Sequence, residues 1–191
     1  MSTDTVTIAA FAGSLRKGSF NRMLLHNAVT LAPSDVRIAP IDIDDVPLFN
    51  ADIESPPPRA VARMRDTIRN ADALLVVTPE YNYSMSGTTK NALDWASRPS
   101  DDSCLNDKPV GLAGCSTGRF GGARAKLALL PVFVFNSMHV LDDPMVHVAR
   151  ANTKFNAQGE LIDDEIKAEM RELLAALAAF ARRLGKGKTA S

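Results

Sequence analysis

The sequence predicts one α/β domain over residues 1–191, a three-layer sandwich in which a five-stranded parallel sheet of order 2-1-3-4-5 lies between helices. The first observation is that short apolar runs alternate with stretches of helical length, which favours right-handed crossovers and parallel strands. The second is that loops rich in glycine, serine or asparagine follow the first, third and fourth runs, at 13–20, 79–87 and 116–122. In this order those strands are neighbours, so the three loops should meet at one edge of the sheet.

The predicted strands are short and nearly continuous in apolar residues, as is typical of strands that are covered on both faces. They occupy residues 5–12, 36–41, 73–78, 109–116 and 138–141, with 145–150 as an extension of the last. The run ALLVVT at 73–78 is the clearest buried strand in the chain.

The predicted helices begin at residues that suit a helix start. Ser19 can cap the first helix, because its hydroxyl can accept a hydrogen bond from a free backbone amide, and Pro58 suits the first position of the second. The last helix has its apolar residues on one stripe, and we expect Gly185 to end it and leave 185–191 as a disordered basic tail. The helices are expected over residues 20–31, 58–70, 88–96, 123–130 and 166–184.

Charge and composition exclude several classes of protein. Lys+Arg and Asp+Glu number 22 each, so no charge excess suggests a nucleic-acid partner. No apolar run approaches the roughly 20 residues that span a bilayer, so we expect no membrane association. The histidines, His26, His139 and His147, are too scattered to suggest a metal site. Cys104 and Cys115 form no CxxC pair, which predicts a reducing, cytoplasmic location and a catalytic role for neither.

The first loop, AGSLRKGSFN at residues 12–21, has the composition of a phosphate-binding loop between a strand and a helix N-terminus. It is not a Walker loop, because Lys17 precedes Gly18 instead of following it. It is not a dinucleotide fingerprint, because Leu15 stands where the second glycine belongs. It therefore suits a monophosphate better than ATP or NAD. Four side chains can donate hydrogen bonds to the phosphate: Ser14, Arg16, Ser19 and Asn21.

The second and third loops suggest the other end of the same ligand. The second, PEYNYSMSG at 79–87, places two tyrosines at the end of a strand, where exposure is costly unless a flat group packs on them. The third, STGRFGG at 116–122, offers hydroxyls and glycines for a close backbone approach. Together the loops predict a mononucleotide site. Plain helix capping in the first loop and an aromatic lid without a ligand in the second remain open alternatives.

Two other chemistries are disfavoured. Ser14 lies outside a Gly-x-Ser-x-Gly elbow, so we do not expect a hydrolase nucleophile there. Asp42, Asp44 and Asp45 could suggest a phospho-acceptor domain of similar fold, but they precede a long loop and no lysine follows a late strand at the expected place. We interpret them as a solvated acidic loop.

The chain resembles the NAD(P)H-dependent FMN reductase family, the flavodoxin-like group of quinone, chromate and azo-dye reductases. The resemblance depends on GSLRKGSFN (13–21), TPEYNYS (78–84), KNALDWASRP (90–99) and GGAR (121–124), and it extends over residues 5–184. The two longer motifs together are highly specific. The resemblance implies a flavodoxin-like fold with FMN as cofactor and NADPH or NADH as co-substrate.

The resemblance also implies roles for the residues of the three loops. The first loop would hold the FMN phosphate through its four donors, and no protein side chain would be catalytic, because FMN performs the chemistry. Backbone amides at 80–82 and 117–118 would stabilise negative charge on the reduced ring. The ring would lie against Pro79, Glu80, Tyr81 and Asn82, with Tyr83 facing the substrate and Ser116, Thr117 and Gly118 at its other edge.

The implied activity is hydride transfer from NAD(P)H through FMN to quinones or similar small acceptors, with chromate and azo compounds among them. The family forms homodimers or homotetramers, with a segment corresponding to 91–98 near the dimer contact, and a partner chain can complete the flavin pocket. The alternative is a flavodoxin-like electron carrier with little turnover of its own. Carriers of that kind are strongly acidic, so the balanced charge of this chain argues against that function.

The sequence departs from the family in the segment SMSGTTKN. The family often has proline at the place of Ser86 and Gly-Leu at the place of Thr88 and Thr89. We expect the loss of proline to loosen the approach of the second loop, and the two β-branched residues to change the start of the following helix.

Overall fold

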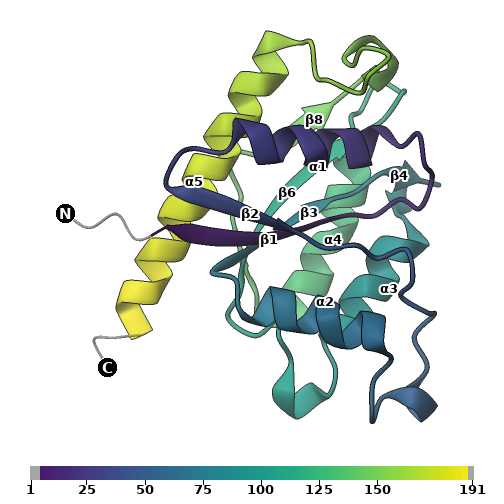
Figure 1. The fold of residues 1–191 in the computed structure, drawn as a ribbon, viewed down its shortest axis with the longest axis vertical. Coiled ribbons are helices and arrows are strands. Elements are labelled where there is room, and N and C mark those ends of the chain that lie inside the picture. The colour runs from purple at the N-terminus through teal and green to yellow at the C-terminus, as the bar shows by residue number, and fades with distance from the viewer. Residues whose placement is uncertain (1–4, 189–191) are drawn as a thin grey trace.

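The computed structural model describes residues 5–188 and confirms the predicted parallel sheet (Figure 1). Its order is β2-β1-β3-β6-β7, with β8 also paired to β6, so the five positions follow the predicted order 2-1-3-4-5. The strands are β1 (Val6–Ala12), β2 (Val36–Pro40), β3 (Ala73–Val77), β6 (Pro109–Cys115), β7 (His139–Val140) and β8 (Val146–Val148).

The fifth position of the sheet is divided between two short strands. β7 pairs with the beginning of β6, where Pro109 is opposite His139, and β8 pairs with its end, where Cys115 is opposite Val148. Both segments were expected, and the residues between them leave the sheet and return to it. β8 therefore lies beside the end of β6, directly next to the third loop.

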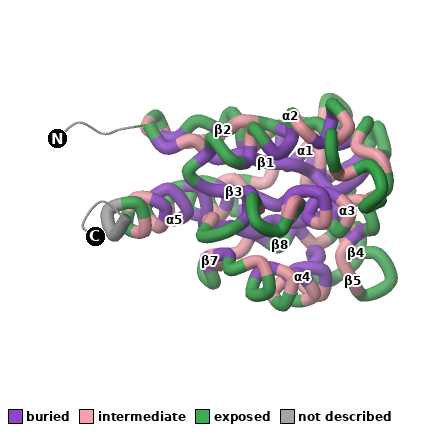
Figure 2. Tube along the Cα trace, turned by 90° about the horizontal axis from the view of Figure 1, so that it is seen from below, coloured by how far each residue is buried: buried purple, intermediate pink, exposed green. Residues whose placement is uncertain are grey.

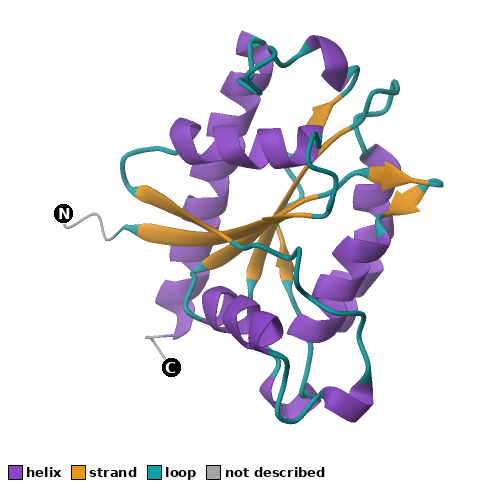
Figure 3. Ribbon diagram, turned by 45° about the vertical axis from the view of Figure 1, so that its right-hand side comes forward, coloured by secondary structure: helices purple, strands orange, loops and turns teal. Residues whose placement is uncertain are grey.

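Helices cover both faces of the sheet and complete the three layers (Figure 3). Along β1, Ile8 and Ala10 pack towards α1 and α5, whereas Ala9 and Phe11 pack towards α2, α3 and α4, as the alternation of side chains along a strand requires. Figure 2 shows the central strands β1 and β3 mostly in purple, buried between the helices. The helices are α1 (Phe20–Leu31), α2 (Arg59–Arg69), α3 (Gly87–Ala96), α4 (Ala123–Phe135) and α5 (Asp164–Lys188).

Shorter elements lie in the connections. A two-stranded hairpin, β4 (Glu80–Tyr81) with β5 (Ser84–Met85), forms within the second loop. Single 3₁₀ turns occur at Ala51–Ile53, Ser100–Asp102 and Ala151–Thr153. No helix within residues 5–188 has the length and apolar character needed to cross a membrane.

Helix boundaries differ from the predictions at both ends of α2 and α5, at the start of α3 and at the end of α4. Pro58 is the N-cap of α2 and not its first residue. α4 continues past Leu130 to Phe135 although it contains Pro131. Proline has no N–H to donate to the carbonyl one turn earlier, but Pro131 lies on an exposed side, so water can bind that carbonyl. α5 continues through Gly185 and Gly187 to Lys188, since each glycine costs only about 1 kcal/mol in a helix. Residues 189–191 of the predicted tail lie outside the described residues.

Candidate functional site

Two cavities open at the carboxyl edge of the sheet, where the three loops meet. The three-loop cavity has a volume of about 440 Å³, and the α3 cavity, between the first loop, the loop after β2 and the start of α3, has about 600 Å³. Both have Ser14, Arg16 and Tyr81 in their walls. The predicted site residues in the wall of the three-loop cavity are Ser14, Arg16, Ser19, Asn21, Pro79, Glu80, Tyr81, Ser116 and Thr117, whereas Asn82, Tyr83 and Gly118 do not line it.

The first loop presents donors to the three-loop cavity. Ser19 caps α1 as predicted, since its Oγ accepts a hydrogen bond from the Arg22 amide at 3.4 Å, and its own hydroxyl hydrogen is still available. Ser14 is 4% exposed and lies in the walls of both cavities. Arg16 is exposed, and no carboxylate within residues 5–188 forms an ion pair with it. An unpaired guanidinium beside two hydroxyls and a helix N-terminus fits an anion.

Asn21 has a structural task that the sequence did not indicate. Its Oδ1 accepts a hydrogen bond from the Cys115 amide at 2.9 Å, and its Nδ2 donates to the Cys115 carbonyl at 3.1 Å. The buried amide thus joins the start of α1 to the end of β6 and holds the first loop against the third. Only one N–H of Asn21 is left for the predicted phosphate contact.

The second loop is a tight hairpin, which was not predicted. Asn82 and Tyr83 have φ values of 49° and 66°, in the left-handed region that a two-residue type I′ hairpin requires at both positions. The sequence signal was weak, because the second position of such turns is usually glycine. The hairpin leaves Tyr81 51% exposed and Tyr83 74% exposed. Tyr81 therefore stands as an open aromatic surface between the two cavities.

Arg124, at the start of α4, connects the second loop to the third. Its Nε donates to Glu80 Oε1 at 2.5 Å and its backbone amide donates to Glu80 Oε2 at 3.1 Å. Its guanidinium lies 3.7 Å from the ring centroid of Tyr83 and 4.3 Å from that of Phe120. The Glu80 carboxylate is therefore occupied within the protein. The motif GGAR contained Arg124, but no sequence pattern indicated this role.

The third loop forms hydrogen bonds within itself. The Gly118 amide donates to Ser116 Oγ at 2.9 Å, and the Gly118 carbonyl accepts from the Arg150 amide at 3.0 Å. In this structure the Gly118 amide, which we expected to face the ligand, is engaged by a neighbouring hydroxyl. Thr117 stays in the wall of the three-loop cavity.

The departure at Ser86 does not loosen the second loop. Ser86 is the N-cap of α3, where its Oγ accepts a hydrogen bond from the Thr89 amide at 3.1 Å. Its hydroxyl donates to the Gly13 carbonyl at 2.5 Å, and so ties the start of α3 to the first loop. The expected loosening is therefore wrong, since a buried serine replaces the rigidity of proline with hydrogen bonds. The expected change at the helix start is a shift to Gly87 as its first residue.

The loop after β2 supplies a wall that sequence reasoning missed. The side chains of Asn91 and Trp95 hold this loop, because Asn91 Nδ2 and Trp95 Nε1 each donate to the Pro47 carbonyl at 2.8 Å. Two residues of the motif KNALDWASRP, Asn91 and Trp95, therefore hold this loop in place. Three apolar side chains of that loop line the α3 cavity: Ile43, Val46 and Leu48.

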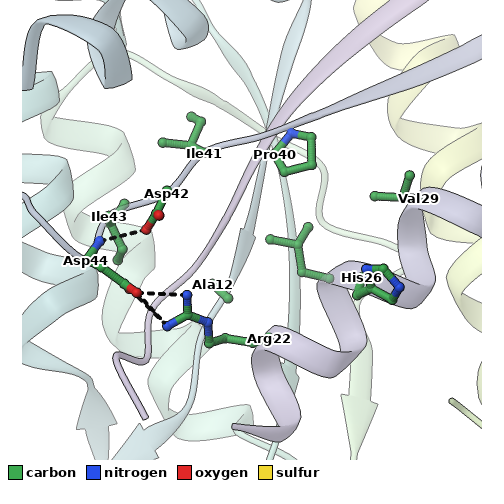
Figure 4. Close-up of a pocket in the computed structure, with 10 residues that line it drawn as sticks. Ala12, Arg22, His26, Val29, Pro40, Ile41, Asp42, Ile43 and Asp44 are labelled. Atoms are coloured by element: carbon green, nitrogen blue, oxygen red, sulfur yellow. Dashed lines mark hydrogen bonds and ion pairs between the residues drawn. The ribbon is translucent and has the colours of Figure 1, made fainter. Parts of the chain in front are cut away.

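The acidic residues of the same loop lie beside a third cavity of about 300 Å³, between α1 and the end of β2 (Figure 4). Arg22 donates two hydrogen bonds to Asp44, from Nη1 to Oδ1 and from Nη2 to Oδ2, both at 2.9 Å, and this contact raises the pKa of Arg22. The Asp44 amide donates to Asp42 Oδ1 at 2.9 Å. Asp44 thus fixes the loop to α1, while Asp42, Asp44 and Asp45 all stay exposed, as expected of a solvated acidic loop.

No group in the walls of the two larger cavities is a strong nucleophile or metal centre. Cys115 lines the three-loop cavity, but burial raises the pKa of its thiol far above the usual range, so the thiol stays protonated. Within residues 5–188, no group of three or more His, Cys, Asp and Glu side chains is placed to hold a metal ion. The cavities can bind and orient a ligand but offer no protein nucleophile for its chemistry.

Comparison with known proteins identifies the family. The family model described as NADPH-dependent FMN reductase matches residues 6–153. An NAD(P)H-dependent FMN reductase of Pseudomonas aeruginosa is 44% identical over 95% of this chain and 98% of its own length. A 2-hydroxy-1,4-benzoquinone reductase of Burkholderia is 37% identical over 92% of this chain and 96% of its own length. The flavoenzyme NAD(P)H:(acceptor) oxidoreductase of Paracoccus denitrificans superimposes with a TM-score of 0.85 at 30% identity, covering 94% of this chain and 98% of that one. The chain belongs to the NADPH-dependent FMN reductase family.

Proposed function

We propose that this protein is an FMN-dependent oxidoreductase that passes hydride from NADPH or NADH through bound FMN to quinones and related small acceptors, including chromate and azo compounds. One observation carries the proposal. A cavity with uncommitted phosphate donors at one end continues past an exposed tyrosine into a second, largely apolar cavity, in a chain of the FMN reductase family.

The phosphate end fits a monophosphate. The hydroxyls of Ser14 and Ser19 and the guanidinium of Arg16 surround the N-terminus of α1, whose partial positive charge adds to the attraction. Lys17 lies before Gly18, so no lysine is placed as in a Walker loop to follow a longer phosphate chain. We assign these three side chains to the FMN phosphate, with the free N–H of Asn21 as a further donor.

The flat end fits the isoalloxazine ring. We place the ring against the backbone of Pro79 and Glu80 and the ring of Tyr81, with Thr117 at its opposite edge. Asn82 and Tyr83 form the tip of the hairpin, where Tyr83 would face an incoming substrate. Gly118 stabilises the third loop through its hydrogen bond to Ser116.

Bound FMN supplies the hydride chemistry, so the protein has to bind, orient and stabilise charge. Backbone amides at 80–82 and at Thr117 are the groups we assign to the negative charge that develops on the ring. The apolar wall formed by Ile43, Val46 and Leu48 would receive the nicotinamide or the acceptor and keep water away from it.

The first experiment is an absorption spectrum of the purified protein before and after incubation with FMN and desalting. We expect retained flavin bands that NADPH or NADH bleaches, followed by sustained NAD(P)H oxidation when a quinone is added. A colourless protein after incubation would overturn the proposal. Bleaching without turnover would favour the flavodoxin-like electron carrier.

We propose a homodimer, with a homotetramer as a dimer of dimers, and we assign the contact to the outer face of α4. Leu127, Val134 and Phe135 are 63%, 73% and 87% exposed on this helix, and such an apolar stripe is unusual on a monomer. Arg124, under the Tyr83 ring, lies at the beginning of the same helix. A second copy on α4 would therefore adjoin the hairpin and could complete the flavin pocket.

We keep the segment 91–98 near this contact, as the resemblance implies. Asn91 and Trp95 point to the Pro47 carbonyl of their own chain. We also propose a cytoplasmic location, which is supported by Cys104 and Cys115 being buried, unpaired thiols.

A further inference from the structure

Two hydroxyl groups at the start of α3 fix the backbone at the beginning of the first loop. The Gly13 carbonyl accepts hydrogen bonds from Ser86 Oγ at 2.5 Å and from Thr88 Oγ1 at 2.9 Å. The Gly13 amide donates to the Val77 carbonyl at 2.8 Å. Both polar backbone groups of Gly13 are thus held, one by the end of β3 and the other by α3.

Counting protons assigns the direction of the network. Each hydroxyl has one hydrogen, and those of Ser86 and Thr88 are committed to Gly13. Thr78 Oγ1 donates its hydrogen to the Pro79 carbonyl at 3.0 Å. Thr89 Oγ1 lies 2.8 Å from Ser86 Oγ and 3.1 Å from Thr78 Oγ1, and its single hydrogen can serve only one of these contacts, which we assign to the shorter one, to Ser86 Oγ. The network therefore converges on the Gly13 carbonyl.

The packing at Gly13 leaves no room for a side chain. A Cβ atom there would lie 1.7 Å from Thr89 Oγ1 and 3.1 Å from Ser86 Oγ. The hydroxyls can reach the carbonyl only because this residue is glycine, so Gly13 and the cluster depend on each other.

Gly13 is the residue through which β3 and α3 hold the start of the first loop, just before the proposed phosphate donors. Ser14 follows it directly, and Arg16 is exposed two residues further on. The Ser14 amide donates to the Ala12 carbonyl at 2.8 Å, and the next backbone hydrogen bond along the loop runs from the Ser19 amide to the Arg16 carbonyl at 3.0 Å. The position of the Gly13 carbonyl therefore sets the direction in which the loop leaves the sheet.

We propose that Ser86 and Thr88 are positioning residues for phosphate recognition: by holding the Gly13 carbonyl they set Ser14 and Arg16 for the phosphate of FMN. The two residues act through the loop and not by touching the phosphate. The inference rests on the proposed FMN site and adds to it a determinant of selectivity for FMN over riboflavin, the same ring system without the phosphate.

Thr88→Val is the cleanest test, because valine has the shape of threonine, and Ser86 also caps α3 whereas Thr88 does not. Affinities of flavin-free protein for FMN and for riboflavin would be measured by quenching of flavin fluorescence. We expect Thr88→Val to weaken FMN binding by about three- to tenfold, as for loss of one hydrogen bond, and to leave riboflavin binding within about twofold. Thr88→Ser, which keeps the hydroxyl, should bind both as the wild type does.

Thr67→Val in α2 is the matched control. Its hydroxyl donates to the Arg63 carbonyl at 2.9 Å on an exposed side, so the substitution removes a helical threonine hydroxyl away from the site. We expect no change in either affinity. Should Thr88→Val fail to fold, Thr88→Ala compared with Thr88→Ser gives the same contrast.

If Thr88→Val loses affinity for FMN and riboflavin equally, or loses none, the positioning role is overturned. The proposed function still stands in that case, provided that the wild type binds FMN. If the wild type itself binds FMN no better than riboflavin, the phosphate site and the positioning role both fail.

Discussion

Helices α4 and α5 are both rich in apolar residues, but the protein covers them differently. In α5, Met170, Leu173, Leu174 and Leu177 form a stripe that is fully buried against the sheet and α1. In α4, one face is buried and the opposite face leaves Phe135 87% exposed. The apolar face of α5 is completely buried within the chain, whereas α4 carries apolar side chains on a second face that the sheet does not cover.

The difference shows why helical periodicity alone does not reveal where a helix packs. The apolar residues of α5 repeat at intervals of three and four with charged residues on the other side, which predicts one buried face. The sequence of α4, ARAKLALLPVFVF, is apolar on nearly all sides after its first residues, so it predicts a second covered face without identifying what covers it. The buried faces also differ, because that of α4 contains Lys126.

Lys126 should give the largest effect. It is 1% exposed, its Nζ donates to the Val146 carbonyl at 2.5 Å, and burial lowers its pKa to about 7 from the ordinary 10.5, although Cys115, Glu169 and Glu80 oppose the shift. Between those pH values the unfolded chain binds the proton and the folded one does not. Lys126 should therefore make a contribution to the free energy of unfolding that rises with pH by up to about 1.4 kcal/mol per unit between pH 7 and 10.5 and is constant outside that range.

Lys126→Met should remove this rise and stabilise the protein at pH 7 by on the order of 3 kcal/mol. Chemical denaturation of both proteins at several pH values from 7 to 10 measures the difference, which should shrink as the pH increases. Lys90→Met, at an exposed position of α3, is the control and should leave the slope unchanged. A parallel pH profile for wild type and Lys126→Met would contradict a buried neutral amine.

Leu174→Ala on α5 compared with Leu127→Ala on α4 tests the packing contrast directly. Leu174 is fully buried, so its truncation should cost about 2–5 kcal/mol of unfolding free energy through lost burial and a cavity. Leu127 is 63% exposed in the single chain, and its truncation should cost less than about 1 kcal/mol at concentrations where the protein is monomeric. Similar losses in the two variants under those conditions would refute the comparison. Denaturant titrations give both values.

Phe135→Asp tests whether a second copy covers α4. If α4 is the proposed contact, each dimer loses two phenylalanines and gains two charges, and the dissociation constant should rise by at least about tenfold. Sedimentation equilibrium measures it. Ile162→Asp is the matched control, since Ile162 is a 54% exposed apolar residue away from α4. A dimer that withstands Phe135→Asp would place the contact elsewhere.

The predicted part of the site depended on strand order. Because parallel strands present their carboxyl ends to one edge, the spacing of Ser14, Tyr81 and Thr117 after three neighbouring strands was enough to bring them to one cavity. The N-cap at Ser19 was equally predictable, since a cap depends only on its own helix. Side-chain partners across loops were not predictable, and Glu80 with Arg124 is the clearest case.

The sequence by itself determined the alternation of elements, the order of the sheet and the three loops at its edge, because these follow from local patterns and from the handedness of crossovers. Only the tertiary structure decided which polar groups are free to bind a ligand. Asn21 and the Gly118 amide are engaged by neighbours from other parts of the chain or loop, whereas Arg16 has no ion-pair partner within residues 5–188. The physical reason is that a hydrogen bond requires two groups within about 3 Å, and in a fold the partner of a loop residue is set by long-range packing.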